Sequence, residues 1–234
     1  MKKILLVFCV LLLTSGCVNR NVDLSQGTIN LETGRIKELK EEKLTKESDQ
    51  EEVKDNDLSY KETKKVSDYV KIEFDNKVMI VELYPEIAPI TVKNFQNLVK
   101  ENFYEGLTFH RLIPGFMAQG GAFDEEGKEK EADTIKGEFR RNGFDNELLH
   151  TKGVISMARL GTDFDSASSQ FFICFDESEA LDGEYASFGK VISDISTLEY
   201  LEKTKIIQNP ETKENSLPKE APVIDSIKFV EVKK

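Results

Sequence analysis

The sequence of 234 residues lacks tryptophan and contains few residues that bind metals or form disulfides. Its two histidines, His110 and His150, lie forty residues apart, without the spacing of a structural zinc site, so we expect no metal. Two of its three cysteines, Cys9 and Cys17, lie within the first 17 residues, which excludes a domain built on disulfides. Cys174 follows an apolar run, and we interpret it as a core residue.

Long apolar runs and strongly basic segments are also missing. The one long run, from Ile4 to Leu13, is shorter than the roughly 20 residues of a transmembrane helix, which excludes a polytopic membrane protein. The formal net charge is −11, and residues 68–234 alone carry −11, whereas residues 1–16 carry +2 and residues 18–67 carry −2. A nucleic-acid partner is therefore excluded, because binding phosphates requires a basic surface.

Aromatic residues are absent between Val18 and Ser59, although the chain contains 15 Phe and 6 Tyr. From Arg35 to Asp68, twenty of 34 residues are charged, with both signs mixed. Such a segment buries too little apolar surface to offset the entropy lost on ordering. We therefore predict a charged flexible tether over residues 17–67 and a folded domain over residues 68–234.

The first seventeen residues predict export. Two lysines, a short apolar run and the small residues Thr14-Ser15-Gly16 before Cys17 are typical of a secretory signal. Leu-Thr-Ser-Gly-Cys resembles a bacterial lipobox, in which the cysteine is acylated. We predict a lipoprotein signal peptide at residues 1–16 and a membrane anchor at Cys17, on the extracytoplasmic face of the cell membrane. An ordinary cleaved signal with an incidental cysteine is the alternative.

The pattern of residues 68–234 predicts a mostly β fold. Alternating apolar and polar residues flank Asp75-Asn76, which is typical of a hairpin. Pro89 opens a predicted helix with an apolar stripe that reaches Val99, and a second helix is expected over residues 197–203. We predict a closed antiparallel β-barrel of about eight strands with two capping helices. The candidate strands are residues 69–74, 77–83, 108–113, 116–119, 135–139, 154–158, 170–175, 186–192 and 223–232.

Motifs for nucleophilic, phosphoryl-transfer and hydride-transfer chemistry are missing. No Gly-x-Ser-x-Gly sequence occurs, and Gly183 to Lys190 has the wrong spacing for a phosphate-binding loop. No dinucleotide fingerprint follows a strand. The sequence therefore predicts no cofactor.

The densest chemical signal is the run FHRLIPGFMAQGG at residues 109–121, which places Arg111 among large apolar side chains. This run resembles the signature of the cyclophilin-type peptidyl-prolyl isomerases. The segments GVISMAR (153–159) and DSASSQFFI (165–173) resemble the central motif of that family, and LDGEYASFGKV (181–191) resembles its third block. The resemblance covers about residues 68–234 and implies a cyclophilin-like fold.

The resemblance also implies a site and a substrate. Arg111 would be catalytic, and the implied substrate-binding residues are His110, Phe116, Met117, Gln119, Ala158, Arg159, Gln170, Phe172, Leu181 and Tyr185. Among these, Gln170 would support Arg111, and His110 and Tyr185 would border the site; His110 could equally be a scaffold residue. His150 lies outside the motifs and is interpreted as structural. We expect the partners to be incompletely folded exported proteins with X–Pro bonds. We expect the protein itself to be a monomer.

Three functions stay open at this point. The first is a membrane-anchored isomerase that assists the folding of exported proteins. The second is a chaperone or binding module for proline-containing segments with weak or lost activity, and the third is a surface adhesin or structural lipoprotein.

Two departures from the family bear on specificity. Ala180 stands where many eukaryotic members carry Trp, which implies weak cyclosporin binding, and residues 124–133 form either a solvated loop or a charged selector of substrates.

We expect palmitate to label the wild-type chain in cells but not the Cys17→Ser variant, because the Cys17 thiol is the predicted acyl acceptor. The measurement is autoradiography of the purified protein. Cys9→Ser is the matched control and should keep the label, since Cys9 lies in the predicted signal peptide. Labelling that persists in Cys17→Ser would contradict the anchor.

Overall fold

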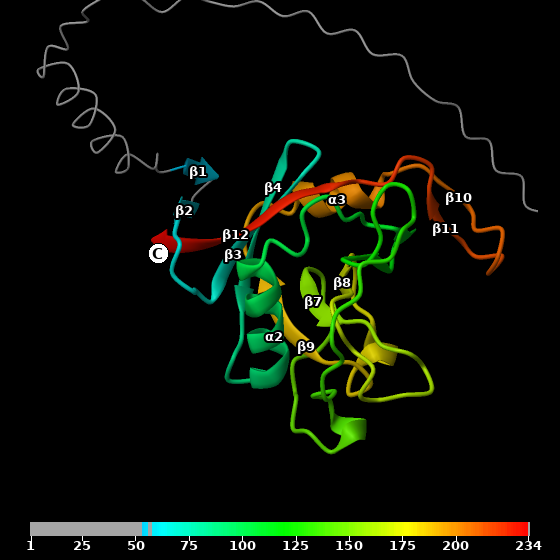
Figure 1. Ribbon diagram of the computed structural model, residues 1–234, viewed down its shortest axis with the longest axis horizontal. Coiled ribbons are helices and arrows are strands. Elements are labelled where there is room, and N and C mark those ends of the chain that lie inside the picture. The colour runs from blue at the N-terminus through cyan, green and yellow to red at the C-terminus, as the bar shows by residue number, and fades with distance from the viewer. Residues whose placement is uncertain (1–52, 56–57, 234) are drawn as a thin grey trace, which may run out of the picture. The chain divides into compact units, whose positions relative to one another are not determined.

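The computed structural model describes residues 53–55 and 58–233 of the chain (Figure 1). The predicted signal peptide, Cys17 and the predicted tether as far as residue 52 lie outside the described residues. Anchor and export signal therefore stay predictions from the sequence.

The described elements are mostly strands. They follow in the order β1 (Val53–Asp55), β2 (Leu58–Glu62), β3 (Tyr69–Phe74), β4 (Lys77–Leu83), α2 (Pro89–Lys100), β5 (Arg111–Ile113), β6 (Met117–Gly120), β7 (Val154–Met157), β8 (Phe171–Cys174), β9 (Ser187–Val191), α3 (Ser196–Glu202), β10 (Ile206–Gln208), β11 (Asn215–Pro218) and β12 (Ile224–Lys233). Two short 3₁₀ helices, η1 (Arg140–Asn142) and η2 (Glu179–Leu181), lie in the connections.

The predicted hairpin and both predicted helices are confirmed. Strands β3 and β4 pair in register across Asp75 and Asn76, whose φ angles of 48° and 58° lie in the left-handed region that tight hairpin turns require. Helix α2 begins at the proline that the sequence marked, and α3 begins one residue before the predicted start.

The prediction of a closed barrel is not confirmed. Ten strands form one sheet in the order β1-β2-β12-β3-β4-β9-β7-β8-β6-β5, so β1 and β5 are its two ends and do not pair with each other. Residues 106–109, which precede β5 in the sequence, lie beside the start of β12 instead. The N–H groups of Gly106 and Phe109 donate to the carbonyls of Ile224 and Pro222, each at 2.9 Å. These isolated bonds link the two regions without a continuous ladder.

The main core lies between the sheet and helix α2. This helix buries Thr91, Val92, Phe95, Leu98 and Val99 on one face, as the apolar stripe predicts. The ring of Phe95 lies 5.8 Å from that of Phe171 and 5.3 Å from that of Phe188, so the helix is fixed to strands β8 and β9 by aromatic contacts. Figure 1 shows α2 beside β9, which carries Phe188.

The strand predicted at residues 135–139 is wrong. Of this segment, Ile135 makes a single bridge to Ala167. The Gly137 N–H donates to Asp165 Oδ1 at 3.0 Å, so it joins no strand ladder. The buried Glu138 carboxylate accepts hydrogen bonds from the N–H groups of Ile90 (3.0 Å) and Thr91 (2.7 Å). An acidic group satisfies the free amides of a helix N-terminus and interacts well with its dipole. The segment is therefore shaped by α2 rather than by a neighbouring strand.

The sheet also includes residues that composition assigned to the tether. Strand β2 pairs with β12 from Glu62↔Val230 to Ser59↔Lys233. The Lys71 ammonium, 8% exposed, bonds to Glu62 on β2 and to Glu73 on its own strand. The sheet thus begins before residue 68. The small β10–β11 sheet was not predicted either.

We expect Glu138→Gln to lower the free energy of unfolding by about 1.5–3 kcal/mol, the range for hydrogen bonds to a charged group. The amide would place an NH₂ group against the backbone N–H donors at the start of α2. Denaturant unfolding followed by circular dichroism measures the change. Glu147→Gln removes an exposed carboxylate and should change the stability little. Equal stabilities of the two variants would contradict the role of Glu138.

Candidate functional site

Strand register places the central candidate residues in one row. Arg111 on β5 faces Gln119 on β6, and Gln119 faces Phe172 on β8. Met117 lies two residues from Gln119 and therefore on the same face. The intervening residues, Leu112, Ala118, Phe171 and Ile173, point to the opposite face and belong to the main core. One set of strands thus supports the core on one face and the candidate site on the other.

Nine of the eleven predicted site residues line one hollow of about 200 Å³. These residues are Arg111, Phe116, Met117, Gln119, Ala158, Arg159, Phe172, Leu181 and Tyr185. They come from four separate stretches of the chain, which the sheet, the β5–β6 turn and the region around η2 bring together. Met117, Phe172 and Cys174 form a small buried cluster at this hollow, against which Phe116, Leu181 and Tyr185 pack. The hollow therefore has an apolar wall, built on this cluster, beside the polar groups of Arg111, Gln119 and Arg159.

The β5–β6 turn that carries Phe116 is fixed from outside. Gly115 has a φ of 73°, a left-handed conformation that other residues rarely adopt. Its N–H donates to the Glu202 carboxylate at 2.8 Å, which ties the turn to the end of α3. Phe175 N–H donates to the Phe116 carbonyl at 2.9 Å. Phe116 is thereby held at the edge of the hollow.

Arg111 supplies the cationic group of the hollow and is bonded on two sides. Its Nη1 donates to Gln119 Oε1 at 3.1 Å, and Gln119 Nε2 donates to Gln170 Oε1 at 2.9 Å. On the other side, Nε and Nη2 donate to the two oxygens of Glu214 at 2.7 and 2.8 Å. Met117 Sδ lies 4.0 Å from Nη1. The guanidinium thus stands at the border between an apolar pocket and a polar chain of side chains.

Glu214 is a site residue that the sequence did not indicate. It immediately precedes β11, and its hydrogen bonds from Arg111 lower the pKa of its carboxyl to about 2, with a smaller contribution from Ser216. Glu214 is therefore ionised at neutral pH. Glu214 belongs to no motif and lies 103 residues from Arg111, so no local pattern pointed to it.

Arg159 uses its side chain for structure. The side chain is 5% exposed, and its Nε donates to the Glu184 carbonyl at 3.0 Å. Its guanidinium lies 4.7 Å from the centre of the Tyr185 ring and 5.0 Å from that of Phe139. These contacts support the wall that Tyr185 forms, and the backbone of Arg159 is what it can present to a peptide.

Two predicted residues do not line the hollow. Gln170 bonds to Gln119 and lines an adjoining hollow of about 160 Å³ with Ala158 and Arg159. His110 packs edge-on against Phe123 at 4.9 Å, and its buried Nδ1 has no hydrogen-bond partner within the described part of the chain. Burial lowers the pKa of His110 to about 4. A backbone hydrogen bond with Thr108 opposes this shift of the pKa, and the charge of Arg111 adds to it, both by smaller amounts. His110 is therefore neutral at pH 7.

The two residues interpreted as structural lie beneath the site. The His150 ring is buried, stacks on Phe172 at 5.9 Å and contacts Asp182 Oδ1 (2.9 Å) and Ser156 Oγ (3.1 Å). Cys174 is fully buried, which raises the pKa of its thiol to about 12. The prediction that Cys174 is a core residue is confirmed.

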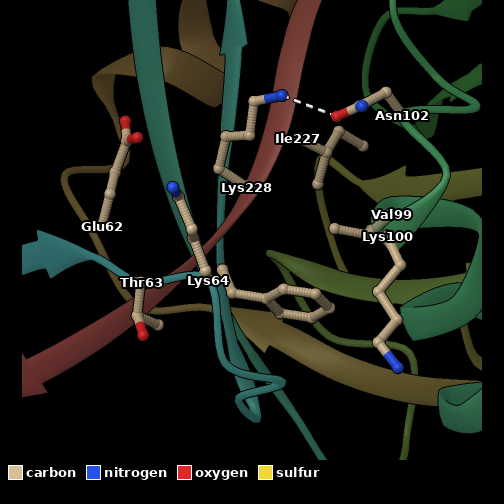
Figure 2. A pocket seen from close by; sticks show the side chains of 9 residues that line it. Glu62, Thr63, Lys64, Val99, Lys100, Asn102, Ile227 and Lys228 are labelled. Carbon is tan, nitrogen blue, oxygen red and sulfur yellow. Dashed lines mark hydrogen bonds between the residues drawn. The ribbon is translucent and has the colours of Figure 1, made fainter.

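A second, larger hollow of about 430 Å³ lies elsewhere, between the β2–β3 connection, the end of α2 and β12. Figure 2 shows its lining, which includes Lys64, Lys100 and Lys228. Lys228 Nζ donates to Asn102 Oδ1 at 2.7 Å and to Glu105 Oε1 at 2.6 Å. None of the predicted site residues lines it, so size alone does not mark the site.

Among residues 53–55 and 58–233, no group of three or more His, Cys, Asp or Glu side chains could hold a metal ion. Within the same residues, no helix is long and apolar enough to cross a membrane.

The geometry therefore combines an apolar pocket with guanidinium N–H donors at its edge, which suits a compact apolar ring joined to a polar backbone. The family model described as cyclophilin type peptidyl-prolyl cis-trans isomerase matches residues 69–228. The chain belongs to the cyclophilin-type peptidyl-prolyl cis-trans isomerases. The match runs from the start of β3 into the first half of β12 and includes all eleven predicted site residues.

Relatives and solved structures agree with this family. The chain is 46% identical over 125 residues to peptidyl-prolyl cis-trans isomerase B of Bacillus subtilis, over 53% of this chain and 82% of that protein. It is 39% identical over 159 residues to a peptidyl-prolyl cis-trans isomerase of Helicobacter pylori, over 67% of this chain and 94% of that one. A crystal structure of a Cryptosporidium parvum cyclophilin matches with a TM-score of 0.60 and 28% identity, covering 71% and 98%. The cyclophilin fold, mostly β with two helices, is thereby confirmed.

We expect His110→Asn to reduce the loss of stability on acidification. An ordinary histidine in the unfolded chain is protonated below about pH 6.5, whereas the folded chain excludes that proton until about pH 4. The free energy of unfolding therefore decreases as the pH is lowered across this window, by at most about 2 kcal/mol per histidine between pH 7 and pH 5.

Denaturant unfolding at pH 7 and pH 5 measures the difference. His150, whose pKa burial also lowers, keeps its share of the pH dependence in the variant. An identical pH dependence in wild type and His110→Asn would contradict the burial of a neutral His110.

Proposed function

We propose that this isomerase acts on X–Pro bonds of exported proteins and is held at the extracytoplasmic face of the cell membrane by a lipid on Cys17. The observation that supports the catalytic part is the hollow in which Arg111 stands beside Phe116, Met117 and Phe172. The anchor and the location are supported by the sequence of residues 1–17. A crystal structure of the Cryptosporidium parvum relative, 28% identical with a TM-score of 0.59, was obtained in the presence of the dipeptide Ala-Pro. A proline-containing peptide is therefore the substrate class to test.

The chemistry of the reaction fits the residues of this hollow. Rotation about a peptide bond has a barrier of about 18–20 kcal/mol because it breaks amide resonance. Uncatalysed X–Pro exchange takes tens to hundreds of seconds. No covalent bond is made or broken, so the reaction requires neither a nucleophile nor a cofactor. What a catalyst must supply is a better fit to the twisted state than to either planar isomer.

In our proposal, Arg111 provides that fit. In the twisted state the prolyl nitrogen becomes pyramidal and regains a lone pair, to which a guanidinium N–H can donate. The planar ground state offers no such acceptor, so the bond forms only as the barrier is approached. Phe116, Met117, Phe172 and Leu181 would hold the pyrrolidine ring while the preceding carbonyl turns. An acceleration of 10⁵ would require about 7 kcal/mol, which one charge-assisted bond and positioning can supply.

Gln119 has a separate place in this proposal. Its side chain joins Arg111 and Gln170 and leaves the amide at the rim between the two adjoining hollows. A peptide that passes from one hollow to the other would meet this amide beside the prolyl bond. Gln119 would hydrogen-bond the peptide backbone there, and Ala158 and Arg159 would offer backbone groups to the residue before proline.

The charge of the domain would keep it away from the lipid surface to which Cys17 is proposed to attach it. Residues 68–234 carry a formal charge of −11. An anionic lipid surface would repel such a domain, which would keep its hollow open to substrates in solution. The segment between Cys17 and β1, a tether by composition, would give the domain reach. The labelling of Cys17 tests the anchor.

We expect Arg111→Ala to lower the isomerase kcat/KM by about a hundredfold or more, because it removes the donor to the prolyl nitrogen. The measurement is a protease-free assay, such as NMR exchange on an Ala-Pro peptide. Lys203→Ala, which removes a cation that is 76% exposed and pairs with Glu199 on its own helix, is the control and should keep wild-type activity. Arg111→Ala with wild-type kcat/KM would overturn the mechanism, and a wild type that binds peptide without isomerising it would favour the chaperone or binding function.

A further inference from the structure

The proposed catalytic arginine has most of its hydrogen-bonding capacity committed inside the protein. An arginine carries five N–H donors. In Arg111, the Nε–H and one N–H of Nη2 bind the two oxygens of Glu214, and one N–H of Nη1 binds Gln119. The second N–H of Nη1 donates to Met117 Sδ at 4.0 Å, and one N–H of Nη2 remains. A thioether sulfur is only a weak acceptor, so both of these N–H groups can be given to a stronger acceptor in the hollow that Arg111 and Met117 line.

Glu214 therefore occupies the edge of the guanidinium that faces away from Gln119. A carboxylate that binds both Nε and Nη2 fixes the plane of the guanidinium as well as its position. Without Glu214, the guanidinium would be held only at Nη1, by Gln119 and by the weak acceptor Met117 Sδ. Since the Arg111 side chain is 35% exposed, these contacts at one nitrogen would leave it freedom to turn toward solvent.

The β10–β11 hairpin that carries Glu214 has a well-defined turn. The side-chain oxygen of Asn209 accepts hydrogen bonds from the N–H groups of Glu211 (2.9 Å) and Thr212 (3.2 Å). The backbone N–H of Asn209 donates to the Glu214 carbonyl at 2.7 Å. Lys213 takes a positive φ of 63°, which brings the chain back toward β11. Figure 1 shows the hairpin at the end of the domain away from α2.

We infer that Glu214 is a positioning residue: it holds the Arg111 guanidinium by its Nε–Nη2 edge, so that the remaining N–H donors face the twisted prolyl bond. This inference rests on the proposed function of Arg111. Glu214 itself does not touch the substrate, and its effect on the reaction passes through Arg111. Glu214 does not line the hollow, so in this inference it leaves the peptide's place free.

A competing and a positioning role of Glu214 predict opposite effects of its removal on the reaction rate. A carboxylate that competed with the peptide for Arg111 would slow the reaction, and its removal would raise activity. A carboxylate that positions Arg111 would speed the reaction, because the donor need not be reoriented as the barrier is approached. Removal of Glu214 should then lower kcat and leave peptide binding nearly unchanged, since the apolar pocket still holds the proline ring.

The test compares Glu214→Gln with Glu211→Gln in the full chain. Both variants remove one negative charge from the same hairpin, but the Glu211 carboxylate does not bind Arg111. NMR exchange on an Ala-Pro peptide gives the rate at saturation, and titration with the same peptide gives its Kd. We expect Glu214→Gln to lower the saturated rate about tenfold, which corresponds to ~1.4 kcal/mol in activation free energy. Its Kd should stay within about twofold of wild type, and Glu211→Gln should match wild type in both.

A double-mutant cycle separates positioning from a general structural effect. In an Arg111→Ala background, adding Glu214→Gln should change the residual rate by less than about twofold, because the group that Glu214 positions is gone. An unchanged or raised rate in Glu214→Gln, or an equal loss in both backgrounds, would overturn the inference. These results leave the proposed function intact, provided that wild type is active and Arg111→Ala is slower by about a hundredfold or more. An inactive wild type would instead contradict the proposed function itself.

Discussion

The alternation of side chains along strands β5, β6 and β8 is the constraint on which this molecule depends. The same three strands bury Leu112, Ala118 and Ile173 in the main core and present Arg111, Gln119 and Phe172 to the hollow. A shift of one residue in their register would move the cation into the core and the apolar residues into solvent. The stability of the fold therefore fixes the geometry of the site.

This arrangement gives each side of Arg111 a different environment. One neighbour is an apolar pocket, and the other two are an amide on β6 and a carboxylate before β11. A guanidinium can serve all three, because its donors lie in one plane but point in different directions. Beneath the pocket, His150 and Cys174 are buried and uncharged, so neither side chain adds a charge under the site.

The short-range features of this fold could be predicted from the sequence. The β3–β4 hairpin, the start of α2 at Pro89 and the burial of Cys174 follow from local turn chemistry and apolar periodicity. Residues 135–139 show where periodicity fails, since their apolar residues suggest a strand but Glu138 is recruited by the amides of a helix 47 residues away. Composition fails to predict the structure of residues 58–62 for a similar reason. Their composition is that of a solvated segment, and they are ordered because β12 and Lys71 offer partners.

The features of the candidate site also fall into two groups: those that the sequence predicts and those that depend on tertiary contacts. The motifs by themselves determined the family and the pocket, because nine of eleven predicted residues meet in one hollow and the register between neighbouring strands is set by the alternation within each motif. Only the tertiary structure decided that the sheet stays open, that His110 turns toward Phe123 and that Glu214 binds Arg111. Each of these depends on a contact between segments far apart in the chain, and a carboxylate in an exposed hairpin carries no local signal of the partner it will meet.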